Sequence, residues 1–169
     1  MAGLIAYYSR AGSNYVNGEI KNLEIGNTRI LAGFIHEYTN APLFEICPLV
    51  PYSEDYSQCV MQARKDMRSQ ARPKLAFYPQ ELEKYDTLFL GFPNYWGTMP
   101  MCVFTFMELF SWRGRRINVF CTHEGDGYGR SLEDLKRLCP EADIHEGPAV
   151  RGAHAAEGRE IINKWLKGL

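Results

Sequence analysis

The feature that most constrains this chain is a regular alternation of short apolar runs with longer helical patterns. Three of the apolar runs occupy residues 3–8 (GLIAYY), 86–91 (DTLFLG) and 116–121 (RINVFC). Short, continuous apolar runs are typical of strands that are buried on both faces of a sheet. Strands that alternate with helices favour a mostly parallel sheet with helices on both of its faces. The pattern therefore predicts an α/β fold.

The whole chain can be divided in this way, and no linker or low-complexity tract interrupts the alternation. A length of 169 residues suits one domain, so we expect residues 1–169 to fold as a unit. The expected strands lie at 3–8, within 42–49, and at 86–91, 116–121 and 144–150. The expected helices lie at 28–39, 53–72, 99–110, 131–139 and 155–166.

Composition excludes several classes of function. The formal net charge of −1 argues against a nucleic-acid-binding surface, which would need a basic stripe. The five cysteines are odd in number and form no CxxC pair, which favours small buried thiols in a reducing compartment over disulfides or zinc. No stretch approaches the roughly 18 apolar residues that span a bilayer, and residues 1–8 do not resemble a signal peptide. We expect a cytoplasmic protein without nucleic-acid or membrane partners.

Ligands of a parallel sheet bind beyond the carboxyl ends of its strands, so the loops after the expected strands are the places to search. The first strand runs into residues 9–12 (SRAG), and a helix follows residues 26–28 (GNT). Small and hydroxylated residues before a helix N-terminus suit a phosphate group, because main-chain N–H groups and the helix dipole favour an anion there. The same residue types also serve as ordinary helix caps. Neither GxxxxGK[ST] nor GxGxxG occurs in the chain.

The loop after the third strand, residues 91–100 (GFPNYWGTMP), holds two aromatic residues between a proline and a glycine. Tyr95 and Trp96 could stack on a flat heterocycle, although aromatic residues at strand ends often only pack against the core.

The loop after the fourth strand, residues 122–129 (THEGDGYG), has glycines at alternate positions. These glycines allow the backbone to approach a ligand closely, or they form a flexible turn. His123 and Glu124 lack a third ligand at useful spacing, so we expect no metal site. No Ser/His/Asp arrangement indicates hydrolytic catalysis, and we assign no catalytic residue.

Taken together, five segments in order resemble the flavodoxin-like family of FMN proteins. They are YSR…GNT, PYSEDY, ARPKL, GFPNYWGT and THEGDG, and they cover nearly the whole chain in register. The resemblance implies a three-layer flavodoxin-like sandwich whose five-stranded parallel sheet has the order 2-1-3-4-5. It also implies that FMN lies at the carboxyl edge of the sheet, where the protein tunes the chemistry of the flavin.

The resemblance assigns the cofactor-binding residues in three groups. The phosphate would be held by Ser9, Arg10, Ala11, Asn27 and Thr28. The isoalloxazine ring would face Pro93, Asn94, Tyr95, Trp96, Gly97 and Thr98, with Tyr95 or Trp96 stacked on it. The other edge of the ring would be lined by Thr122, His123, Glu124, Gly125 and Gly127.

One segment departs from the family pattern, because residues 12–25 separate the phosphate loop from its helix. Asn17-Gly18 is a strong signal for a two-residue hairpin turn. We expect an inserted hairpin over the phosphate and ribityl end of the site, with a disordered surface loop as the alternative.

Three functions remain open at this point. The first is an electron-transfer protein that shuttles electrons through non-covalently bound FMN, between redox partner proteins or to a small electron acceptor. The second is an FMN-dependent NAD(P)H or quinone-type reductase, although no nicotinamide site is recognisable. The third is a non-redox binding module on the same fold, against which the aromatic and glycine-rich loops argue.

Overall fold

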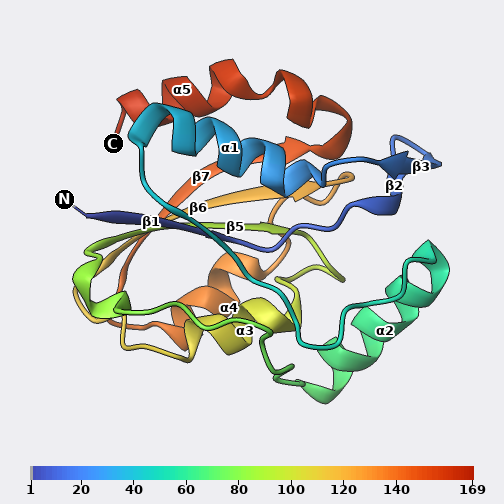
Figure 1. Ribbon diagram of the computed structural model, residues 1–169, viewed down its shortest axis with the longest axis horizontal. Coiled ribbons are helices and arrows are strands. Elements are labelled where there is room, and N and C mark those ends of the chain that lie inside the picture. The colour runs from blue at the N-terminus through green and yellow to red at the C-terminus, as the bar shows by residue number, and fades with distance from the viewer. Residues whose placement is uncertain (1) are drawn as a thin grey trace.

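A computed structural model describes residues 2–169 and shows a five-stranded parallel sheet between two layers of helices (Figure 1). The order of the strands is β4-β1-β5-β6-β7, and each neighbouring pair is parallel. With the separate hairpin set aside, this is the expected order 2-1-3-4-5, and the flavodoxin-like sandwich is confirmed. The strands are β1 (Gly3–Tyr7), β4 (Leu43–Glu45), β5 (Thr87–Pro93), β6 (Arg116–His123) and β7 (Asp143–Arg151).

Apolar clusters on both faces of the sheet explain why the central strands are continuously apolar. On one face, Leu31 of α1 (Asn27–Thr39) and Ile162 of α5 (Arg159–Lys167) belong to one buried cluster. On the other face, α3 (Met101–Met107) and α4 (Ser131–Leu138) pack in a second cluster (Figure 1). Short 3-10 helices at η1 (Leu82–Lys84) and η2 (Gly152–Glu157) complete the connections.

The remaining helix, α2 (Tyr56–Ser69), stands beside the carboxyl end of the sheet instead of covering a face (Figure 1). Only Cys59 and Ala63 are buried among its residues. The helix begins later than the expected 53–72, because Asp55 is the N-cap and its carboxylate accepts the Gln58 N–H at 2.9 Å. The position of α2 leaves it free to form a wall at the edge where ligands of parallel sheets bind.

The expected hairpin is present as β2 (Gly12–Val16) and β3 (Glu19–Leu23), which pair antiparallel. Asn17 and Gly18 both have positive φ, 51° and 89°, as a type I′ turn requires. The hairpin forms a two-stranded sheet of its own and lies at the same end of the molecule as α2 (Figure 1).

Within residues 2–169, none of the helices has the length and apolar character needed to cross a membrane.

Candidate functional site

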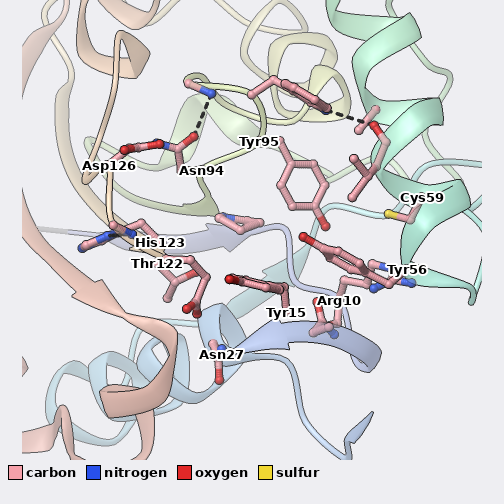
Figure 2. Close-up of a pocket in the computed structure, with 18 residues that line it drawn as sticks. Arg10, Tyr15, Asn27, Tyr56, Cys59, Asn94, Tyr95, Thr122, His123 and Asp126 are labelled. Carbon is pink, nitrogen blue, oxygen red and sulfur yellow. Dashed lines mark hydrogen bonds between the residues drawn. The ribbon is translucent and has the colours of Figure 1, made fainter. Parts of the chain in front are cut away.

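A cavity of about 420 Å³ opens at the carboxyl ends of the central strands (Figure 2). This volume lies within the range of small-molecule sites. Its lining comes from six parts of the chain: the loop after β1, the hairpin, the start of α1, α2, and the loops after β5 and β6. The lining residues are Arg10, Asn14, Tyr15, Asn27, Tyr56, Cys59, Val60, Ala63, Pro93, Asn94, Tyr95, Trp96, Gly97, Thr122, His123, Glu124, Gly125 and Asp126.

The N-terminus of α1 meets the cavity at Asn27. The N-cap is Gly26, which has no side chain to cap the helix, and the first turn holds no acidic residue. Ser9 Oγ accepts the Arg29 N–H at 3.1 Å. The Thr28 and Thr122 hydroxyls are hydrogen-bonded at 2.8 Å and buried, which ties the first turn to β6. A helix start that carries no carboxylate of its own favours an anion beside it.

The loops that continue β5 and β6, residues 93–98 and 122–129, are called here the inner wall. Tyr95 and Thr98 exchange main-chain hydrogen bonds of 2.9 and 3.2 Å around a tight turn. Trp96 and Gly97 at the centre of this turn have φ of 56° and 81°. The Arg130 N–H donates to the Gly97 carbonyl at 2.7 Å, so the second loop supports the first.

Tyr95 and Trp96 have different surroundings, although they are neighbours in the chain. The Tyr95 ring points into the cavity and meets Tyr8 edge to face, with 5.7 Å between ring centroids (Figure 2). Burial raises the pKa of Tyr95 above its ordinary value, which already lies above physiological pH, so its hydroxyl is neutral. Trp96 instead lies on α2, where its Nε1–H donates to the Val60 carbonyl at 2.9 Å. The Arg64 guanidinium lies 5.0 Å from the centroid of the Trp96 ring system.

The opposite side of the cavity, called here the outer wall, consists of the hairpin and α2. The Arg10 guanidinium joins them, because it donates to the carbonyls of Ser13 in the hairpin and of Ser53 and Glu54 before α2. The last two bonds measure 2.8 and 2.9 Å. Tyr15 and Tyr56 also stack across this junction, with ring centroids 6.2 Å apart.

Glu124 connects the outer wall to the inner wall. Its Oε2 accepts the main-chain N–H of Asn17 at the hairpin turn, at 2.9 Å. Arg151 donates to the Glu124 carbonyl at 3.0 Å and holds this loop from the side of β7. The hairpin is therefore fixed at two places on different sides of the cavity.

The structure brings most of the predicted residues to one place. The predicted residues that line the cavity are Arg10, Asn27, Pro93, Asn94, Tyr95, Trp96, Gly97, Thr122, His123, Glu124 and Gly125. Those outside its lining are Ser9, Ala11, Thr28, Thr98 and Gly127. Of these, Ser9 and Thr28 form hydrogen bonds in the first turn of α1, and the Gly127 carbonyl accepts a hydrogen bond from the Asn94 side chain.

Sequence reasoning missed the contribution of the outer wall. The missed lining residues of the outer wall are Asn14, Tyr15, Tyr56, Cys59, Val60 and Ala63, and Asp126 of the inner wall was missed as well. Tyr56 belongs to the PYSEDY segment and Tyr15 to the predicted hairpin, so both carried a usable signal. No group of three or more possible metal ligands occurs in the part of the chain that the structure describes.

Comparison with known structures agrees with this architecture. A candidate flavoprotein from Bacteroides uniformis superposes with a TM-score of 0.77 at 24% identity, covering 98% of this chain and 97% of that one. A flavoprotein from Lactobacillus acidophilus in complex with FMN gives 0.66 at 17% identity, with 98% of each chain covered. A flavodoxin from Streptococcus pneumoniae gives 0.56 at 12% identity, covering 99% and 96%. These identities establish the fold alone.

Among curated protein sequences, none matches this chain. A family model described as flavodoxin, however, matches residues 22–169, which is most of the chain and includes both inner-wall loops. The chain therefore belongs to the flavodoxin family.

Proposed function

We propose that this protein binds FMN non-covalently in the cavity and transfers electrons through it. The observation that carries this proposal is that the cavity combines a helix N-terminus with an aromatic ring. The N-terminus of α1, whose N-cap Gly26 has no side chain, lies at Asn27, and an aromatic ring, Tyr95, projects into the cavity from the inner wall. A ligand with an anionic end and a flat ring end matches both features.

The residues present fit the parts of FMN. The first turn of α1 with Asn27 would hold the phosphate, where the helix dipole favours negative charge. Tyr95 and the glycine-containing inner wall would bind the flat ring, with Tyr15 and Tyr56 on the opposite side of the cavity. Arg10 would act on the phosphate only through its charge, because its guanidinium is bound to main-chain carbonyls.

The bound flavin would supply the electron-transfer chemistry, and the chain would orient it, shield it and tune it. Tyr95 remains neutral and therefore offers a hydroxyl and a ring face instead of a charge. The outer wall would reduce contact between the ring and water, because Tyr15 and Tyr56 line the cavity on that side. The FMN complex of the Lactobacillus acidophilus flavoprotein, which has the same fold, supports FMN over other flat anions. We propose a cytoplasmic location, with redox proteins or a small acceptor as partners.

A pair of titrations tests this function. Cofactor-free protein is titrated with FMN and with riboflavin, and binding is followed by quenching of flavin fluorescence. FMN should bind at least tenfold more tightly than riboflavin, because only FMN carries a phosphate for the α1 start; this corresponds to about 1.4 kcal/mol. Equal affinity for the two ligands would contradict the phosphate site, and absence of FMN binding would overturn the proposal.

Turnover separates the carrier from the reductase. The FMN-loaded protein is mixed with NADPH or NADH and a soluble quinone, and oxidation of the nicotinamide is followed by absorbance. A carrier without its partner should show no sustained oxidation, whereas steady turnover would identify the alternative, an FMN-dependent reductase.

A further inference from the structure

We propose that Asn94 is a positioning residue that fixes the two inner-wall loops to each other and directs the Gly97 N–H away from the ligand. This inference rests on the proposed function only for its effect on a bound flavin. The arrangement of the loops themselves is a property of the protein without ligand.

Three hydrogen bonds place Asn94 between the loops, and each measures 2.8 Å. Its main-chain N–H donates to the Thr122 carbonyl at the end of β6. Its side-chain Nδ2 donates to the Gly127 carbonyl, and its Oδ1 accepts the Gly97 N–H. One side chain therefore holds both the turn at 95–98 and the glycine-rich loop at 122–129.

The amide group suits this position because it provides a donor and an acceptor on one planar group. A carboxylate would keep the acceptor for Gly97 and lose the donor for Gly127. A methyl group would lose both. Gly97 and Gly127 have φ of 81° and 56°, in the left-handed region, and they have no side chains that could restrain their conformation. The hydrogen bonds from Asn94 therefore provide a restraint that these two glycines cannot provide themselves.

The bonds at Gly97 determine what the inner wall offers to a ligand. Its N–H is occupied by Asn94 Oδ1, and its carbonyl is occupied by the Arg130 N–H. A donor that is bound to Asn94 cannot also stabilise negative charge on the ring. The structure thus assigns to Asn94 the removal of one hydrogen-bond donor from the wall that faces the reduced flavin.

Two substitutions of Asn94 distinguish the role of its side-chain acceptor from the role of its side-chain donor. Asn94→Ala frees the Gly97 N–H, which can then donate to the reduced ring and stabilise its negative charge, so the reduction potential should become less negative. Asn94→Asp keeps the Gly97 N–H bound and adds a negative charge to the cavity, so the potential should become more negative. A merely structural loosening would not move the potential in opposite directions.

Amide hydrogen exchange of the cofactor-free protein tests the arrangement of the loops without flavin. Protection of the Gly97 amide should fall about tenfold in Asn94→Ala, as expected for loss of one partly buried hydrogen bond. Protection should remain close to that of the wild type in Asn94→Asp. Asn163→Ala and Asn163→Asp on α5, outside the cavity lining, serve as matched controls.

The potentials of the FMN-loaded variants are then measured by stepwise reduction with dithionite against reference dyes. Shifts of opposite sign in the two Asn94 variants, with no shift in the Asn163 variants, would support the proposal. Unchanged Gly97 exchange in Asn94→Ala, or shifts of the same sign, would overturn it. If wild-type protein binds no FMN, the proposed function fails, while the exchange measurement still decides the role of Asn94 in the loops.

Discussion

The inner and outer walls of the cavity are held in place by different kinds of interaction. The inner wall continues β5 and β6, two of the most buried strands, and main-chain hydrogen bonds connect its loops. The outer wall is attached mainly by a few side chains. Arg10 bridges the hairpin to the segment before α2, and Glu124 holds the hairpin turn. α2 itself buries only Cys59 and Ala63.

This difference in attachment predicts that the two walls have different roles. Segments with few buried apolar contacts open at lower free energy than core segments, whereas segments that continue core strands open only with the fold. We therefore expect the inner wall to set the geometry of the ligand and the outer wall to control its entry and release.

Gly129→Ala should damage the inner wall most. A Cβ at this position would lie 2.3 Å from the Gly97 carbonyl oxygen, and the residue has a φ of 55°. The loops would have to separate, and a cost of about 3 kcal/mol would lower FMN affinity roughly 100-fold. Gly114→Ala is the matched control, with a φ of 67° and open space around its Cβ. The control should lose about 1 kcal/mol of stability and keep its affinity; equal affinity of the two variants would contradict the prediction.

Thiol labelling should distinguish the walls without any loop mutation. Burial raises the pKa of both Cys59 in the outer wall and Cys121 in β6, the latter to about 12. Because the thiolate is the nucleophile, both should react slowly with iodoacetamide at pH 8 and faster as the pH rises. Cys59 should react at least tenfold faster than Cys121 because α2 opens more easily.

Mass spectrometry of the labelled peptides identifies the modified thiol, and Cys59→Ala confirms the assignment. FMN should slow the labelling of Cys59. Equal rates for the two thiols would show that the outer wall opens no more readily than the sheet.

Arg10→Ala should release the hairpin from α2 and leave the sheet intact. We expect chymotrypsin to cleave the hairpin faster and FMN affinity to fall about tenfold, through loss of charge-assisted hydrogen bonds. The melting temperature should change little. Arg113→Ala removes an exposed arginine that is paired with Glu141 and is not part of the cavity lining, and it serves as the control. Cleavage at the wild-type rate would mean that other contacts hold the hairpin.

Trp96→Phe should have the smallest effect of the four. The change keeps an aromatic ring and removes the hydrogen bond from Nε1 to the Val60 carbonyl. A loss of about 0.7 kcal/mol corresponds to roughly threefold weaker FMN binding, measured by fluorescence titration. Trp112→Phe removes a comparable bond to the Met107 carbonyl in the core and should lower stability without changing affinity. A large loss of affinity in Trp96→Phe would instead place Trp96 directly on the ligand.

The contrast between the inner and outer walls also explains which features could be predicted from the sequence. The strand order is implied by the resemblance to the flavodoxin-like family, whereas the parallel sheet and the location of the cavity follow from the alternation of buried runs, because parallel strands bring the ends of β1, β5 and β6 to one edge. The hairpin follows from Asn17-Gly18, because both turn positions require positive φ. These predictions depend on local chemistry and on rules of topology.

The outer wall could not be predicted in the same way. The position of α2 beside the sheet depends on long-range contacts, such as that of Trp96 with Val60, which leave no periodic pattern in the sequence. Arg10 was expected at a phosphate, but a guanidinium binds carbonyls equally well, and the nearby carbonyls of residues 53 and 54 became visible only in the fold.

The bond between the Asn17 N–H and the Glu124 carboxylate has one further consequence. Through this bond, the free energy of opening the hairpin is coupled to the free energy of ligand binding at the loop after β6. A ligand that stiffens residues 122–129 also makes it harder to pull the hairpin away, and by reciprocity an event that pulls the hairpin away weakens the hold on the ligand. A single hydrogen bond between the Asn17 main-chain N–H and the Glu124 side chain thus gives the exterior of the hairpin a means of influencing how long the cavity keeps its occupant.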